Sequence, residues 1–230
     1  MSLWTPVVYR LCRHLVIGPV LYLLGRPQVT GREHIPRRGP VILAANHLAV
    51  LDSFYLTLAA RRHVAFLAKR EYFDRSGILG WTQRMFFRAV GQIDVDRRGG
   101  SASSTALDAA MSILADGGAW GIHPEGTRSP DGRLYRGRTG AVRVAMETCA
   151  PLIPVAITGT RPGSRPWWRR RVRIEILEPV DLEQYRDTGA DGVRAATDDI
   201  MRTIAITTGQ QIVNGYAREW RSHSECSDAA

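Results

Sequence analysis

Short apolar runs alternate with helical patterns along most of the chain. Runs bounded by polar or turn-forming residues predict strands at residues 28–30, 41–45, 64–68, 92–95, 119–122, 152–157 and 172–177. Between them, apolar residues at helical spacing predict helices at about 52–60, 78–89, 103–115, 139–149 and 192–220. Strands separated by helices, without repeats or low-complexity linkers, indicate a single α/β domain with a largely parallel, mixed sheet flanked by helices. The strand at 172–177 is the one expected to break the parallel order.

The N-terminal segment has a pattern of its own. An apolar run from 15 to 24 follows Arg10 and Arg13, which predicts a helix over about 4–24. The pattern fits a helix that lies in a membrane interface, and it fits an ordinary helix packed on the domain equally well. The run is shorter than the ~18 apolar residues that suggest a membrane span. The expected organisation is an N-terminal interfacial helix, a main domain and a disordered tail, over residues 1–26, 27–220 and 221–230.

The charge balance narrows the class of partner. The 230 residues include 31 Lys and Arg against 22 Asp and Glu, which gives a formal charge of +9. Such a balance favours an anionic partner, whether nucleic acid, an anionic lipid surface or a phosphorylated substrate, and does not choose among them. The three cysteines, at 12, 149 and 226, are far apart. They suggest neither a disulfide framework nor a zinc site, and they fit a reducing compartment.

Two polar clusters follow apolar strands directly, where open α/β sheets place their ligands. In the first, His47 follows the strand at 41–45, and Asp52 lies five positions later, where the next helix opens. If the aspartate folds back on the imidazole, it fixes the tautomer and leaves the other ring nitrogen to act as a general base. The alternative is a solvated loop histidine beside an aspartate that caps the helix. The spacing alone does not decide between them.

The second cluster follows the strand at 119–122 and indicates an anion clamp. Gly126 suits a tight turn that exposes backbone N–H groups, and Arg128 offers a planar donor fork for phosphate. We expect Glu125 to bind substrate hydroxyls or to hold Arg128. Lys69 and Arg97 also follow apolar runs, so two further cations are expected at the same edge of the sheet. The alternative is a surface turn with an incidental ion pair.

These clusters resemble the glycerolipid acyltransferases typified by 1-acylglycerol-3-phosphate acyltransferase. The likeness extends from about 31 to 157 and includes four blocks in the family's order, at residues 46–52, 91–97, 124–129 and 151–155. It implies a glycerol-3-phosphate acyltransferase-like fold, with His47 and Asp52 as the histidine-x4-aspartate motif and Arg97 as a phosphate-binding arginine. Thr127 belongs to the third block, the most specific of the four. The chain departs from the family at Ala49, often serine, and His123, commonly phenylalanine.

The resemblance implies transfer of an acyl group from acyl-CoA or acyl carrier protein to the free hydroxyl of lysophosphatidic acid, which gives phosphatidic acid. No cofactor and no metal are expected. We interpret Cys149 as a packed core thiol and Ser53 as a helix-capping residue, so no covalent acyl-enzyme is needed. Alternatives are the same chemistry on another lysophospholipid, a glycolipid or a small alcohol, and a non-enzymatic basic module that binds membrane or nucleic acid. Nucleic acid is the less favoured partner, because charge alone would not require His47, Asp52 and Glu125 at strand ends.

A stretch rich in tryptophan and arginine, at 165–171, suits the headgroup layer of an anionic bilayer. A solvated basic loop is its alternative interpretation. With the N-terminal helix, the stretch predicts a cytoplasmic protein that is peripheral on the inner face of the membrane.

Overall fold

The structure is a computed structural model that describes residues 15, 18–69, 92–95, 102–161, 163 and 171–217. For 68–69, 92–95 and 102–103 it describes the backbone alone. Several expected features lie outside the described residues: the helix at 78–89, Arg97, the stretch at 165–170, the tail at 221–230 and most of the first 17 residues.

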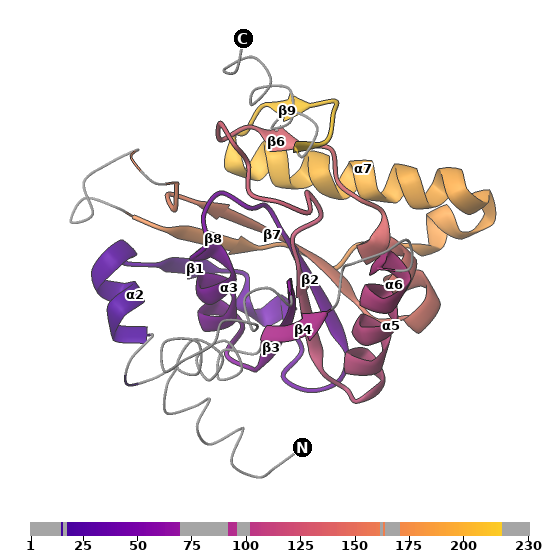
Figure 1. Cartoon of the computed structure of the whole chain (residues 1–230), viewed down its shortest axis with the longest axis horizontal. Coiled ribbons are helices and arrows are strands. Elements are labelled where there is room, and N and C mark those ends of the chain that lie inside the picture. Colours follow the sequence, from indigo (N-terminus) through magenta and orange to yellow (C-terminus); the bar gives the residue numbers. More distant parts are fainter. Residues whose placement is uncertain are drawn as a thin grey trace.

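Within the described part of the chain, seven strands form one sheet in the order β1-β8-β7-β2-β5-β3-β4 (Figure 1). The strands are β1 (Gln28–Thr30), β2 (Val41–Ala45), β3 (Val64–Lys69), β4 (Gln92–Val95), β5 (Ala119–Ile122), β7 (Leu152–Thr158) and β8 (Arg173–Ile176). Every pair is parallel except β7 with β8. The predicted α/β class and largely parallel sheet are therefore confirmed, and the last predicted strand does break the parallel order.

Helices cover both faces of the sheet. They are α2 (Gly18–Gly25), α3 (Asp52–Ala60), α5 (Ala102–Ala115), α6 (Gly140–Thr148) and α7 (Gly189–Thr208), with short 3-10 helices at Arg32–His34 and Glu183–Thr188. Strand β2 shows why two cores form, because successive side chains point to opposite faces. Val41 and Leu43 pack with α2 and α3, whereas Ile42 and Ala44 pack with α5, α6 and α7. A central strand buried on both faces explains its uninterrupted apolar run.

The last helix is shorter than predicted. Helix α7 ends at Thr208, and Gly209 follows in the left-handed conformation (φ 71°) that commonly terminates helices. The chain then forms β9 (Ile212–Val213), which pairs in parallel with β6 (Leu134–Tyr135). The expected helix over 192–220 was therefore wrong at both ends. Two-residue strands carry no periodicity, which is why the sequence did not predict β6 and β9.

Cys149 is exposed, so its interpretation as a packed core thiol was wrong. Helix α6 ends at Thr148, and Cys149 turns out of it with a positive φ of 52°. Its Sγ lies 3.5 Å from Nη2 of Arg186. The apolar positions at helical spacing belong to α6, and Cys149 lies one residue beyond the end of that helix.

Helix α2 packs on the domain through its buried residues Gly18, Leu21 and Gly25. Leu21 on α2 is buried, and its carbonyl accepts a 3.1 Å hydrogen bond from the hydroxyl of Tyr55. Other apolar side chains of α2 are exposed: Val20 by 48%, Tyr22 by 52% and Leu23 by 67%. The helix thus has one face on the domain and one face outward. No helix among the described residues has both the length and the apolar character needed to cross a bilayer.

Candidate active site

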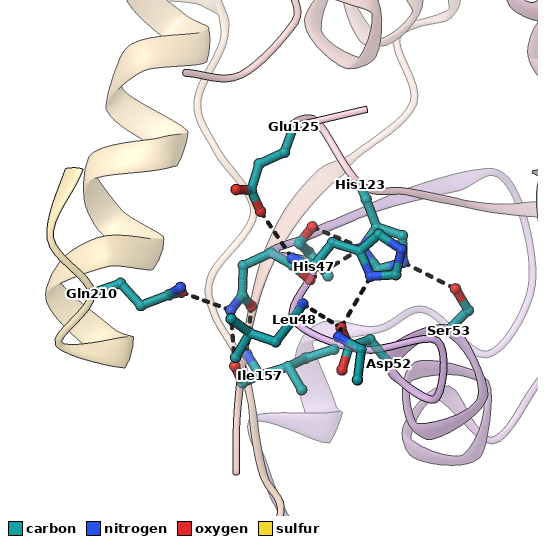
Figure 2. A network of polar contacts seen from close by, with 11 residues as sticks. His47, Leu48, Asp52, Ser53, His123, Glu125, Ile157 and Gln210 are labelled. Carbon is teal, nitrogen blue, oxygen red and sulfur yellow. Dashed lines mark hydrogen bonds and ion pairs between the residues drawn. The ribbon is translucent and has the colours of Figure 1, made fainter. Parts of the chain in front are cut away.

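The two polar clusters meet because β2 and β5 are parallel neighbours. Their register pairs Ala44 with Ile122, so the chains leave the sheet side by side. His47 follows β2 by two residues, and His123 follows β5 directly. The two imidazole rings stack almost parallel, with 3.9 Å between centroids and 8° between planes. Figure 2 shows the polar contacts around this pair.

His47 contacts Asp52 as the sequence predicted. Its Nδ1 lies 3.0 Å from Oδ2 of Asp52, a fully buried residue that opens α3. Because a carboxylate oxygen accepts, Nδ1 carries the proton and donates it, and Nε2 of the neutral ring holds a lone pair. The same Oδ2 accepts hydrogen bonds from the backbone N–H groups of Leu48 (2.6 Å) and Ala49 (2.7 Å). Asp52 therefore orders the His47 loop and does not cap the helix.

Glu125 supports the main chain of His47. It is 2% exposed, and its carboxylate accepts hydrogen bonds from the N–H groups of His47 (2.9 Å) and Tyr135 (3.0 Å). Burial raises the pKa of Glu125 to about 7, although both hydrogen bonds favour the charged form. The His47 carbonyl in turn accepts a 2.7 Å bond from the N–H of Ser129. The expectation that Glu125 binds substrate hydroxyls or holds Arg128 is replaced by this buried role.

The other residues of the second cluster form a tight turn. Gly126 has a φ of +73°, and its N–H donates a 2.9 Å hydrogen bond to the carbonyl of His123. The predicted tight turn is therefore present, with this N–H used inside it, and substrate binding by Gly126 stays a prediction. Thr127 is half-buried and Arg128 is exposed at the surface of the turn. Anion binding by Arg128 stays a prediction.

The described residues give a partial view of the two further cations. Lys69 is the last residue of β3 and pairs in register with Val95 at the end of β4. Since β3 and β4 run parallel to β2 and β5, the Lys69 backbone lies at the same edge of the sheet as His47. Arg97 lies outside the described residues. Substrate binding by these two residues stays a prediction.

Asn46 is a site residue that sequence reasoning missed. It is fully buried, and its side-chain amide pairs with both backbone groups of Ile157: Nδ2 donates to the carbonyl (2.9 Å) and Oδ1 accepts from the N–H (2.8 Å). The side chain thus replaces a peptide group at the end of the β2–β7 ladder. Nδ2 also donates to Oε1 of Gln210, just beyond α7, at 2.8 Å. The available signal in the sequence was an asparagine placed directly between the apolar strand and the histidine.

His123 and Ser53 form a second pair that the sequence did not predict. Nδ1 of His123 lies 3.0 Å from the carbonyl of Ala45 and 3.1 Å from that of Asn46. Carbonyls only accept, so Nδ1 carries the proton, and Nε2 accepts from the Ser53 hydroxyl at 3.0 Å. Burial, followed by the charge of His47, lowers the pKa of His123 to about 3. Ser53 therefore serves this ring, which corrects its interpretation as a helix cap.

The arrangement can carry out base-assisted transfer to a hydroxyl. Nδ1 of His47 donates to the carboxylate of Asp52, and Nε2 carries a lone pair that can accept a proton. The His47 side chain is 17% exposed. Within the described ranges, no group of three or more His, Cys, Asp or Glu residues could hold a metal ion.

The comparisons with known proteins agree with this geometry. A model of the Acyltransferase family matches residues 26–158, which is more than half of the chain. The chain belongs to the Acyltransferase family. The match includes both polar clusters and every strand of the main sheet except β8. The resemblance seen in the sequence is confirmed.

Two relatives of this acyltransferase indicate how far the likeness extends. The 1-acyl-sn-glycerol-3-phosphate acyltransferase of Limnanthes alba is 28% identical over an alignment of 202 residues that covers 83% of this chain and 68% of the relative. The 1-acyl-sn-glycerol-3-phosphate acyltransferase alpha of Ovis aries is 27% identical over 203 residues, with the same two coverages. Both matches extend well beyond the family model.

A solved structure has the same fold as this acyltransferase. It is the crystal structure of the 1-acyl-sn-glycerophosphate (LPA) acyltransferase PlsC from Thermotoga maritima, with a TM-score of 0.61 and 26% sequence identity. The alignment covers 88% of this chain and 79% of that chain. The α/β fold with helices on both faces of the sheet is therefore shared with a known acyltransferase.

Proposed function

We propose that this acyltransferase moves a fatty acyl group from a thioester to the free hydroxyl of lysophosphatidic acid and forms phosphatidic acid. The observation that carries the proposal is the His47–Asp52 contact of 3.0 Å at the carboxyl ends of parallel strands. The names of the relatives, 1-acyl-sn-glycerol-3-phosphate acyltransferase, support the acceptor. Family membership favours this enzyme over a basic module that only binds membrane or nucleic acid.

In the proposed reaction, Nε2 of His47 takes the proton of the acceptor hydroxyl. The hydroxyl oxygen attacks the thioester carbonyl and forms a tetrahedral intermediate, which collapses with cleavage of the carbon–sulfur bond. The thiolate leaves and takes the proton back from His47, so an ester and a free thiol are the products. Asp52 stabilises the imidazolium that forms in between. The thioester belongs to acyl-CoA or to an acyl carrier protein, and no resident cofactor takes part.

Basic residues at the same edge are proposed to bind the acceptor phosphate. Arg128 is exposed on the turn whose Ser129 N–H bonds to the His47 carbonyl, which places this turn beside the base. Its planar guanidinium matches phosphate oxygens in a bidentate geometry. Thr127 on the same turn, Lys69 at the end of β3 and Arg97 beyond β4 are proposed to complete the phosphate site.

The outward face of α2 is proposed to lie on the membrane surface. Val20, Tyr22 and Leu23 are exposed there by about half or more of their surface, and Arg26 is exposed at the end of the helix. Apolar and aromatic side chains flanked by a cation suit the boundary between headgroups and acyl chains. The anionic inner face of a cell membrane is the surface that the net charge of +9 favours.

The test is acyl transfer by the purified chain. Labelled acyl-CoA and lysophosphatidic acid are incubated with the wild type and with His47→Ala, and the lipid products are separated. We expect phosphatidic acid from the wild type and a rate lower by roughly 10² to 10⁴ from the variant, the usual contribution of a positioned base. A parallel assay with acyl carrier protein as the donor identifies the thioester.

Other outcomes reject parts of the proposal. Product at the same rate from both proteins excludes His47 as the base. Transfer to another lysophospholipid, a glycolipid or a small alcohol, in preference to lysophosphatidic acid in competition, replaces the acceptor. Absence of any product, with salt-sensitive binding to anionic vesicles or nucleic acid that survives His47→Ala, indicates a binding module.

A further inference from the structure

His123 is the least expected residue of the site. Its ring lies 3.9 Å from the ring of the proposed base and almost parallel to it, so the two imidazoles share a face (Figure 2). Two histidines stacked in this way repel each other if both are charged. Burial of His123 favours an uncharged ring at that position.

The contacts around His123 fix one tautomer. The carbonyls of Ala45 and Asn46 both face Nδ1 and require a proton there. Nε2 faces the Ser53 hydroxyl, which can donate to its lone pair. Burial and the nearby charge of His47 favour the neutral ring and lower its pKa to about 3. The charge of Asp52 and the hydrogen bonds to the carbonyls of Ala45 and Asn46 act in the opposite direction and raise the pKa.

The ring is also held in place by its apolar surroundings. The ring of Phe66 on β3 lies 5.8 Å from that of His123, at 21° between planes. Gly121, two residues before His123, makes room for Phe66: a Cβ at this glycine would lie 2.4 Å from the Phe66 ring. The position of His123 is thus determined from β2, α3 and β3 together, before any substrate binds.

We propose that His123 is a positioning residue for His47. Its neutral ring is held in one orientation by Ala45, Asn46 and Ser53, and the ring of the base stacks on it. The flat face restricts rotation of the His47 imidazole and keeps Nε2 directed away from Asp52. A neutral ring also allows His47 to take up a proton during the reaction, because it adds no positive charge 3.9 Å away. The kinetic part of this inference rests on the proposed acyl transfer.

Two substitutions distinguish the contribution of the His123 ring from that of its hydrogen bonds. His123→Phe keeps a flat ring and loses both nitrogens, whereas His123→Asn keeps a donor for the carbonyls of Ala45 and Asn46 and loses the ring. We expect His123→Phe, which keeps a ring beside His47, to lower kcat less than His123→Asn does. We expect His123→Asn to lower kcat roughly tenfold or more with KM for both substrates little changed, because a displaced base slows the chemical step and not binding.

Nuclear magnetic resonance of ¹⁵N-labelled imidazoles tests the neutral state without an activity assay. The His123→Phe spectrum identifies the His123 signals by their absence. We expect His123 to stay in the Nδ1–H tautomer from pH 8 to pH 5, and we expect His47 to keep its Nδ1–H tautomer in the Phe variant and to lose it, by exchange between tautomers, in the Asn variant. Circular dichroism establishes that both variants are folded.

Three results would overturn the inference. His123 signals that titrate near the ordinary histidine pKa of about 6.5 would exclude a locked neutral ring. Equal kcat values in the two variants would mean that the ring face has no role. An unchanged His47 tautomer in the Asn variant would mean that the stack does not orient the base. If the wild type transfers no acyl group, the proposed function fails, and the magnetic resonance data still decide the positioning role.

Discussion

The backbone N–H of His47 donates a 2.9 Å hydrogen bond to Oε1 of Glu125, which lies 78 residues further along the chain. This bond joins the two polar clusters at the level of the main chain. With the bond from the Ser129 N–H to the His47 carbonyl, it fixes both sides of the histidine that carries the proposed chemistry. The base is therefore held by its backbone as well as by Asp52.

Glu125→Gln tests the buried carboxylate. The folded-state pKa of Glu125 is raised from 4.5 to about 7, so its protonated form contributes stability that is present below about pH 4.5 and lost as the pH rises through about 7. The variant lacks this titration. We expect the free energy of unfolding of the wild type to fall by about 1–3 kcal/mol relative to the variant between pH 5 and pH 8. Urea unfolding across this range measures it, and parallel pH curves would contradict the expectation.

Asp52→Asn tests the orientation of the base. The substitution removes the negative charge that stabilises a protonated His47. It also places an amide nitrogen at the position of Oδ1, a buried atom that has no hydrogen-bond partner among the described residues. We expect kcat to fall by roughly 10² or more and the free energy of unfolding to fall by about 1–3 kcal/mol.

Asp198→Asn is the matched control for Asp52→Asn. Asp198 pairs with Arg194 on the surface of α7, and its side chain is 41% exposed. Rates within about twofold of the wild type are expected from this surface change. A similar loss of kcat in both variants would show that the Asp52 effect is not specific to the site.

Asn46→Ala tests the side-chain amide that extends the β2–β7 ladder. The change leaves the buried N–H and C=O of Ile157 without their partner. We expect a loss of about 1–3 kcal/mol for each group left unpaired. Gln210→Ala removes the bond to Asn46 and a bond to the Gly132 carbonyl, and it leaves the pairing of Ile157 intact. It should therefore lower the urea midpoint less. Equal midpoints for the two variants would contradict the importance of the Ile157 pairing.

Arg128→Ala tests the proposed phosphate contact. Loss of a charge-assisted hydrogen bond, about 1.5–3 kcal/mol, predicts a KM for lysophosphatidic acid that is roughly tenfold to hundredfold higher. The KM for a monoacylglycerol, which has no phosphate, should not change. Arg202→Ala on α7, where the arginine is 61% exposed, is the control and should leave both values within about twofold. An equal effect of Arg128→Ala on both acceptors would exclude phosphate binding by this residue.

The local pattern of the sequence was enough to predict most elements. The predicted strand at 41–45 and helix at 52–60 coincide with β2 (Val41–Ala45) and α3 (Asp52–Ala60). The contact between His47 and Asp52 was also predicted, although the spacing alone left a solvated loop histidine open and the resemblance to the histidine-x4-aspartate motif favoured the contact. Predictions failed where no periodic signal exists, as in β6 and β9, and where a positive φ ends a helix, as at Cys149 and Gly209.

By itself, the sequence determined the α/β class, the order of the elements, the family and the pairing of His47 with Asp52, since these depend on local spacing and on motifs. Only the tertiary structure decided what Glu125, Asn46, Ser53 and His123 do. Each of these polar side chains is satisfied by a partner that is distant in the sequence. Which partner that is depends on the strand order, with β2 between β7 and β5, and strand order leaves no trace in the hydrophobic pattern of any single strand.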